Sequence, residues 1–140
     1  MKWYLASRMR HSIVMNELSS SLKSQGEEIV YQWSSMGSLK PYSDNAKKSS
    51  SIANDISNSI VQADIFVLIS DEAGTDMFIE LGLAISHWMS DSTVKIYVVG
   101  KYNDRSLMHF HPAIKRVKSF NDILEVECSN IVNEKYKVIE

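Results

Sequence analysis

Residues 65–85 read IFVLISDEAGTDMFIELGLAI, and this stretch decides the fold. Its first five residues are continuously apolar, which is typical of a central strand of a parallel sheet. Residues 75–89 then carry apolar side chains at helical spacing and predict a helix that follows the strand. Glu80 lies inside this apolar pattern, where an unpaired carboxylate is costly. Its position needs a reason, and catalysis is the leading one.

Strands and helices alternate on both sides of this stretch. Such alternation, without an internal repeat or a domain boundary, predicts one α/β domain over residues 1–140 with an open parallel sheet of about five strands. A helix that starts near residue 121 would take Asn121 as its N-cap. The other predicted strands cover residues 3–6, 29–33, 94–100 and part of 114–120, and the other helices cover residues 13–22, 52–61 and 121–132.

The composition narrows the class of protein. The chain has 140 residues, a net charge of −2 and 44% hydrophobic residues, so nothing favours a nucleic acid polymer or an anionic membrane as a partner. The one cysteine, Cys128, fits a reducing compartment. The first residues are too short in apolar side chains for a signal peptide, and no apolar run approaches the length of a membrane helix. We therefore expect a cytoplasmic protein.

Polar segments follow the predicted strands. Parallel sheets bind ligands beyond the carboxyl ends of their strands, so these segments are expected to frame a site. The long segment 34–48 carries Gly37 and Pro41 and is predicted to be a loop that is functional or mobile. The other segments at this edge are residues 7–11, 70–75 and 100–111.

Several common motifs are missing from the sequence. It has no GxGxxG or GxxxxGK[ST] pattern for nucleotides and no GxSxG pattern for a serine hydrolase. His109 and His111 have no neighbouring acidic or cysteine cluster at metal-binding spacing, so no metal site is expected and solvated or capping histidines are the simpler interpretation. No cofactor is indicated.

Glu80 suggests a specific chemistry. A carboxylate at the base of a pocket can attack the anomeric carbon of a sugar, as in retaining glycosidases, and a second group then handles protons. Asp55 is the candidate for that second group, with Asp71 and Asp76 as competitors. The simpler alternatives are a structural pairing of Glu80 with an arginine or a backbone group, and a solvated helix face for Asp55.

Several motifs occur in an order that resembles a known family. Tyr4-Leu5-Ala6, Ala63-Asp64-Ile65-Phe66-Val67, Gly74-Thr75 followed by Phe78-Ile79-Glu80-Leu81-Gly82-Leu83-Ala84, and Lys95 to Gly100 resemble the nucleoside 2-deoxyribosyltransferase superfamily. This superfamily includes 2'-deoxynucleoside 5'-phosphate N-hydrolases, and its short bacterial and phage members look most similar. The resemblance covers roughly residues 1–124. It implies a flavodoxin-like or Rossmann-like three-layer sandwich.

The resemblance also implies roles for individual residues. The family cleaves the N-glycosidic bond of nucleosides or nucleotides, so Glu80 would be the nucleophile and Tyr4 would orient its carboxylate. Asp55 matches the aspartate that handles protons, and Gly82 would let the helix pack closely at the site. The segment from Gly74 to Glu80 is longer than in the transferases. Asp76, within this segment, is an alternative to Asp55 and a candidate to contact the base.

The resemblance extends to the binding of substrate. Related phosphate-accepting hydrolases hold a 5'-phosphate on the first loop, where this chain has Ser7, Arg8 and Arg10, and solvated surface charges are the simpler alternative. The other expected substrate-binding residues are Trp33, Gly74, Asp76, His109 and His111.

Two main functions follow as expectations. The first is an enzyme, a nucleotide N-hydrolase or nucleoside deoxyribosyltransferase that acts on a small-molecule nucleoside or nucleotide. The second is a module that binds such a ligand without turning it over. A flavin carrier is a third possibility that rests on fold class alone. Since members of the family associate, a homodimer or larger assembly is expected, with His87, Trp88 and Met89 as interface candidates, although Trp88 fits core packing equally well.

Overall fold

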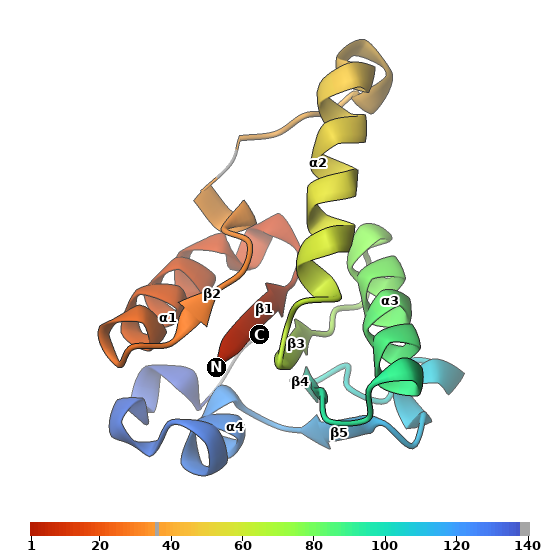
Figure 1. Cartoon of the computed structure of the whole chain (residues 1–140). Coiled ribbons are helices and arrows are strands. Elements are labelled where there is room, and N and C mark those ends of the chain that lie inside the picture. Colours follow the sequence, from red (N-terminus) through yellow and green to blue (C-terminus); the bar gives the residue numbers. More distant parts are fainter. Residues whose placement is uncertain (36, 138–140) are drawn as a thin grey trace.

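The computed structural model describes residues 1–35 and 37–137 and consists of a parallel β-sheet between two layers of helices (Figure 1). The five strands are ordered β2-β1-β3-β4-β5, and each neighbouring pair is parallel. This arrangement confirms the predicted flavodoxin-like or Rossmann-like sandwich. Its elements are β1 (Lys2–Ala6), α1 (Ser12–Ser24), β2 (Glu28–Ile29), α2 (Ala46–Ile60), β3 (Ile65–Ile69), α3 (Asp76–Ser90), β4 (Lys95–Val99), β5 (Ile114–Val117) and α4 (Phe120–Glu127).

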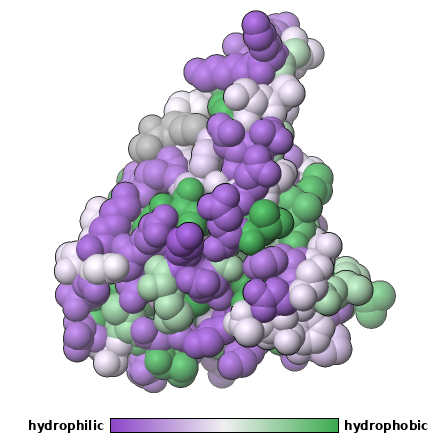
Figure 2. Space-filling model, viewed as in Figure 1, coloured by the Kyte–Doolittle hydropathy of each residue, from purple (hydrophilic) through white to green (hydrophobic). Residues whose placement is uncertain are grey.

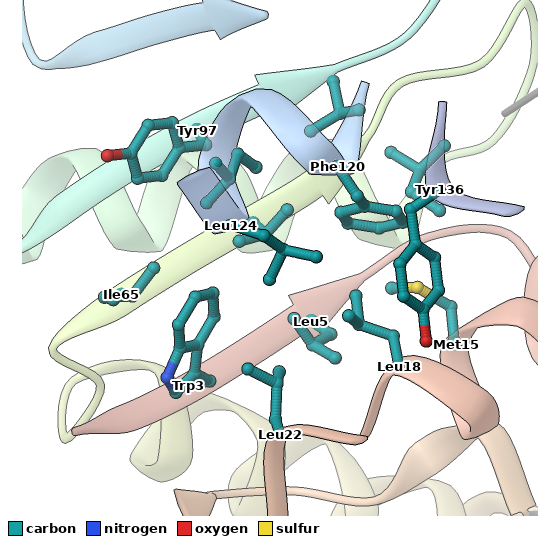
Figure 3. Close-up of a cluster of buried hydrophobic side chains, with 14 of the residues drawn as sticks. Trp3, Leu5, Met15, Leu18, Leu22, Ile65, Tyr97, Phe120, Leu124 and Tyr136 are labelled. Atoms are coloured by element: carbon teal, nitrogen blue, oxygen red, sulfur yellow. The ribbon is translucent and has the colours of Figure 1, made fainter. Parts of the chain in front are cut away.

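The side chains of the central strands alternate between two cores, because successive residues of a strand point to opposite faces of the sheet. Trp3 and Leu5 of β1 pack with α1 and α4 in one core, together with Tyr136 (Figure 3). Tyr4 and Ala6 point the other way, into the core under α2 and α3. β3 is buried at all five of its residues, which explains its continuous apolar sequence.

The second predicted strand is longer than the one observed. Residues 29–33 were expected to be extended, but β2 ends at Ile29 and Trp33 begins a short 3-10 segment, Trp33–Ser35. The indole N–H of Trp33 donates a hydrogen bond to the carbonyl of Leu5, at the end of β1. Trp33 therefore buries its indole in the core, and residues 30–33 do not extend the edge strand.

The loop predicted over residues 34–48 is also shorter. A 3-10 segment, Tyr42–Asn45, leads into α2, which starts at Ala46. The first turns of α2 carry lysines and serines that lie in solvent, so they give no apolar periodicity. This end of α2 projects above the body of the molecule (Figure 1), and its surface is mostly hydrophilic (Figure 2).

The last predicted helix begins and ends earlier than expected. Ser119, not Asn121, is the N-cap of α4, and it forms a capping box with Asp122. Asn121 is buried instead, and its side chain makes two hydrogen bonds to the backbone of Asn133. The helix ends at Glu127, and Ile131 lies in a separate 3-10 segment. Among the described residues, no helix is long and apolar enough to cross a membrane.

Candidate active site

Glu80 and Tyr4 meet on the α2–α3 side of the sheet. Tyr4 points to this side because of the alternation along β1, and its ring stacks on Phe66 of β3, its partner in register, at 5.5 Å between centroids. The Tyr4 hydroxyl donates a hydrogen bond to Oε1 of Glu80, one turn into α3. In the described part of the chain, the carboxylate is thus held at Oε1, and no bond to Oε2 is found there.

The environment of Glu80 favours its protonated form. Burial raises the pKa of Glu80 to about 7, the hydrogen bond from Tyr4 opposes this shift, and the charge of Asp76 adds to it. Asp76 lies four residues before Glu80, so both carboxylates occupy the same face of α3. A carboxyl with such a pKa exchanges its proton near neutral pH, which suits a group that takes part in chemistry.

A cavity of about 320 Å³ opens between α2 and α3 in front of Glu80. We call it the Glu80 cavity. Its polar walls include Glu80, Asp76 and Tyr42, and its apolar walls include Ile52, Ile56, Ile79 and Leu83. An apolar space with a few convergent polar groups is typical of a small-molecule site, and this volume is at the lower end of the usual range.

A second cavity adjoins the first at the carboxyl ends of β1 and β3. We call it the arginine cavity, and Tyr42 and Asp76 line both spaces. The Tyr42 hydroxyl lies 3.5 Å from Oδ2 of Asp76, at the boundary between them. The other polar or close-packed residues of the arginine cavity are Ser7, Arg8, Arg10, Lys40, Gly74 and Thr75.

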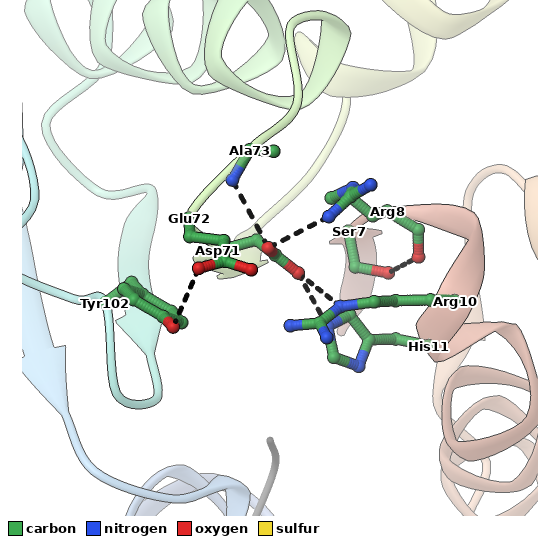
Figure 4. A network of polar contacts seen from close by, with 8 residues as sticks. All are labelled: Ser7, Arg8, Arg10, His11, Asp71, Glu72, Ala73 and Tyr102. Carbon is green, nitrogen blue, oxygen red and sulfur yellow. Dashed lines mark hydrogen bonds and ion pairs between the residues drawn. The ribbon is translucent and has the colours of Figure 1, made fainter.

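Asp71 binds Arg8 and Arg10, two residues that line the arginine cavity (Figure 4). Its side chain is fully buried, and Nη1 of Arg8 and Nε of Arg10 donate to its two oxygens at 3.1 and 2.6 Å. Nε2 of His11 lies 3.2 Å from Oδ2. Burial alone would raise the pKa of Asp71, but the bonds from Arg10, Arg8, the Ala73 amide and His11 outweigh it and lower the pKa to about 2.

Gly74 allows the two loops of the arginine cavity to approach each other. Its φ angle is +118°, a conformation that residues with a Cβ rarely adopt. A Cβ at this position would lie 2.8 Å from Cε of Met77 and 3.4 Å from Cγ of Arg8. The glycine predicted to bind substrate thus lines the arginine cavity and packs directly against Arg8.

Asp55 is not among the residues that line the Glu80 cavity in the described structure. It lies on an exposed face of α2, outside the described lining of both cavities, and its charge acts on Tyr31. Asp76, the alternative that the sequence left open, lines both cavities. The helical period explains the difference, because Ile52 and Ile56 turn toward α3 and Asp55 lies off that stripe.

Three other predicted substrate-binding residues lie away from these cavities. Trp33 is buried in the core with α1. His109 is buried between Ser70 and Ser106, whose hydroxyls lie 2.9 and 2.5 Å from its two ring nitrogens. His111 accepts a hydrogen bond from the Ala113 amide and packs against Trp88. The histidines therefore tie the loop after β4 to its surroundings rather than face the cavities.

Two cavity residues were not anticipated from the sequence. Lys40 and Tyr42 were part of the loop predicted to be functional or mobile, but nothing singled them out. The signal that was available is the length of this loop, together with an aromatic and a basic residue beside Pro41. Within the described part of the chain, no group of three or more His, Cys, Asp or Glu side chains could hold a metal ion.

The fold has a counterpart among solved structures. It is similar to that of the CMP N-glycosidase BcmB from Clostridium botulinum, with a TM-score of 0.54 and 15% sequence identity over 84% of this chain and 88% of that chain. No family model and no curated protein matches the sequence. At this identity the likeness concerns the fold. The fold of this chain is therefore like that of this N-glycosidase, and it is consistent with the three-layer sandwich that the sequence motifs implied.

Proposed function

We propose that this protein cleaves the N-glycosidic bond of a nucleoside 5'-monophosphate or a related nucleoside. The observation that carries the proposal is the Glu80 carboxyl, which lines a ligand-sized cavity, has a pKa near 7 and is oriented by Tyr4. A carboxylate held at one oxygen and open at the other is the arrangement that a glycosidic nucleophile requires. The CMP N-glycosidase activity named for the structural neighbour supports the same class of reaction.

In the proposed reaction, Oε2 of Glu80 attacks C1' of the sugar. The C1'–N bond breaks, the base departs with the bonding electrons and gains a proton, and an ester joins C1' to Glu80. Water then attacks C1', loses a proton and releases the sugar phosphate and the free carboxylate. If a second base replaces water, the outcome is transfer instead, and we favour hydrolysis.

Asp76 is the group that we assign to proton handling. It shares the Glu80 cavity and lies one helical turn from the nucleophile, whereas Asp55 is exposed and outside the described lining of that cavity. Two carboxyl groups on one side of a cavity are a common way to divide nucleophilic and acid–base work. In this assignment Asp76, as a carboxylate, takes a proton from the attacking water, and the departing base takes its proton from solvent.

The arginine cavity supports a phosphorylated substrate. It adjoins the Glu80 cavity, and Arg8, Arg10 and Lys40 supply three cationic side chains along its wall. The first turn of α3 also lines this space, and the amide N–H groups of a helix start favour an anion. A nucleotide would then place its phosphate in the arginine cavity and its sugar beside Glu80.

The proposal is tested by following free base after incubation with panels of nucleosides and nucleoside monophosphates. The wild-type protein should release base at a rate that rises with pH and levels above about pH 7, because the nucleophile must be ionised. Glu80→Gln should lower the rate by at least 10³-fold, as expected for loss of a nucleophile. Glu72→Gln, an equal change at an exposed carboxylate, is the matched control.

Two results would count against this function. Base release that survives in Glu80→Gln would exclude the nucleophile. A ligand that binds the wild-type protein and is recovered intact after long incubation would favour the alternative, a module that senses a nucleotide without cleaving it. The same panel, analysed by calorimetry and by chromatography, separates the two functions.

A further inference from the structure

Asp71 is a fully buried carboxylate that the proposed reaction does not use. It follows β3 directly, and four donors reach its two oxygens. Oδ1 accepts from Arg8 at 3.1 Å and from the Ala73 amide at 3.3 Å, and Oδ2 accepts from Arg10 at 2.6 Å with His11 at 3.2 Å. A carboxylate offers about four lone-pair sites, so Asp71 has no free acceptor for a substrate.

The two arginines, in contrast, retain free capacity. Their side chains are 39% and 45% exposed, and both line the arginine cavity. A guanidinium carries five N–H donors in a fixed plane, and the bond to Asp71 uses one donor of each. Arg8 binds Asp71 through a terminal nitrogen, and Arg10 binds it through Nε. The two guanidinium groups therefore approach the carboxylate through different nitrogens (Figure 4).

The contact also joins two separate loops. Arg8, Arg10 and His11 belong to the turn between β1 and α1, whereas Asp71 and Ala73 belong to the turn between β3 and α3. Residues of both turns line the arginine cavity. Without a shared partner, two half-exposed arginines side by side would repel each other and lose several rotatable bonds on binding a ligand.

We propose that Asp71 is a positioning residue that holds Arg8 and Arg10 as a preorganised clamp for the 5'-phosphate of the substrate. This inference rests on the proposed function, because it assigns the phosphate to the arginine cavity. Asp71 acts through the two guanidiniums and does not touch the substrate. Its loss should therefore weaken the binding of phosphate-bearing ligands and leave the chemistry at Glu80 largely intact.

Asp71→Asn is the informative substitution. An asparagine keeps the shape of the side chain, but its amide nitrogen donates, so in either orientation it faces a donor from Arg8 or Arg10. One guanidinium must then move away. Asp91→Asn is the matched control, since Asp91 is exposed and bonds only locally to Thr93 among the described contacts.

The first measurement is a calorimetric titration with inorganic phosphate, which needs no turnover. We expect Asp71→Asn to weaken phosphate binding at least tenfold and Asp91→Asn to leave it unchanged. The second measurement compares base release from a nucleoside monophosphate and from the same nucleoside. Asp71→Asn should raise KM for the monophosphate at least tenfold, with kcat changed less than threefold and the nucleoside unaffected.

Each outcome decides the proposal. Unchanged phosphate binding in Asp71→Asn, or equal losses for the nucleoside and the monophosphate, would overturn the clamp. Should that variant fail to fold, Arg10→Lys takes its place, because it keeps the charge but lacks the Nε donor, and it should weaken phosphate binding similarly. If the wild-type protein releases no base, the proposed function fails, and the phosphate titration still decides the role of Asp71.

Discussion

At the scale of single residues, two carboxylates near the same strand ends differ sharply. Asp71 is buried but meets four donors, so its pKa falls to about 2. Glu80 is half-buried, and the described structure gives it one donor, Tyr4, beside the charge of Asp76, so its pKa rises to about 7. The number of donors, rather than burial itself, decides which carboxylate stays ionised and which one exchanges a proton near neutral pH.

This difference makes the stability of the protein depend on pH through Glu80. Its pKa is near 4.5 in an unfolded chain and about 7 when folded, so the folded state holds the proton more tightly. The free energy of unfolding therefore falls as pH rises from about 4.5 to about 7. Glu80→Gln should remove this fall. The free energy of unfolding of the variant, relative to that of the wild type, should therefore be higher at pH 8 than at pH 4 by up to about 3 kcal/mol.

Urea denaturation at pH 4, 6 and 8 measures this prediction. Glu72→Gln should keep the pH dependence of the wild-type protein, since Glu72 is exposed. Parallel curves for Glu80→Gln and the wild type would show that the Glu80 carboxyl titrates normally in the folded protein.

At the scale of elements, the turn between β3 and α3 decides the geometry of the site. It places Asp71 under the arginines, Gly74 against Arg8, and Asp76 between the two cavities. The positive φ of Gly74 bends the chain so that α3 starts beside the turn after β1. The turn between β3 and α3 thus supplies Asp71, which binds the arginines, and leads directly into α3, the helix that carries Glu80.

Gly74→Ala tests this turn. A Cβ there is strained by the backbone and meets Met77 and Arg8, so we expect a loss of about 1–3 kcal/mol in the free energy of unfolding. Phosphate binding should weaken too, because Arg8 is displaced. Gly26→Ala is the control, as Gly26 also has a positive φ but nothing within 4 Å of a Cβ. Chemical denaturation measures the stability of both variants, and phosphate titration should show weaker binding for Gly74→Ala than for Gly26→Ala. Equal phosphate affinities of the two variants would contradict the contact with Arg8.

At the scale of the whole molecule, the helix layer formed by α2 and α3 presents exposed apolar side chains on its outer surface. On the outer face of α3, Ile79 and Met89 are 66% and 74% exposed, and Gly82 between them has open space above it.

On α2, Lys48 and Asp55 lie seven residues apart on one exposed face, so two antiparallel copies could pair their charges. We propose that a second copy of the chain packs on this side. Of the expected interface residues, Met89 is available, whereas Trp88 is half-buried against His111.

Molar mass in solution checks this association. Light scattering after size-exclusion chromatography should give twice the chain mass of 15.9 kDa for the wild type. Met89→Asp should shift the protein toward the monomer, because it puts a charge into an apolar contact. Val126→Asp, an equally exposed position on α4 beyond the other face of the sheet, should stay dimeric. Weak dimers have dissociation constants on the order of micromolar. A wild-type protein that remains monomeric at roughly 100 times such a dissociation constant would contradict the proposal.

The sequence by itself determined the order of strands and helices around residues 65–85. Apolar runs and apolar periodicity report burial, so the parallel sheet, β3 and α3 were predictable, and the observed contact between Tyr4 and Glu80 agrees with the family resemblance. The tertiary structure decided what periodicity does not encode. It left Asp55 outside the described lining of the Glu80 cavity, buried Trp33 and His109 among structural contacts, and brought Lys40 and Tyr42 to the cavities. The pairing of Arg8 and Arg10 with Asp71, about sixty residues away, arises because parallel strands bring their carboxyl ends together, and chain distance carries no record of that meeting.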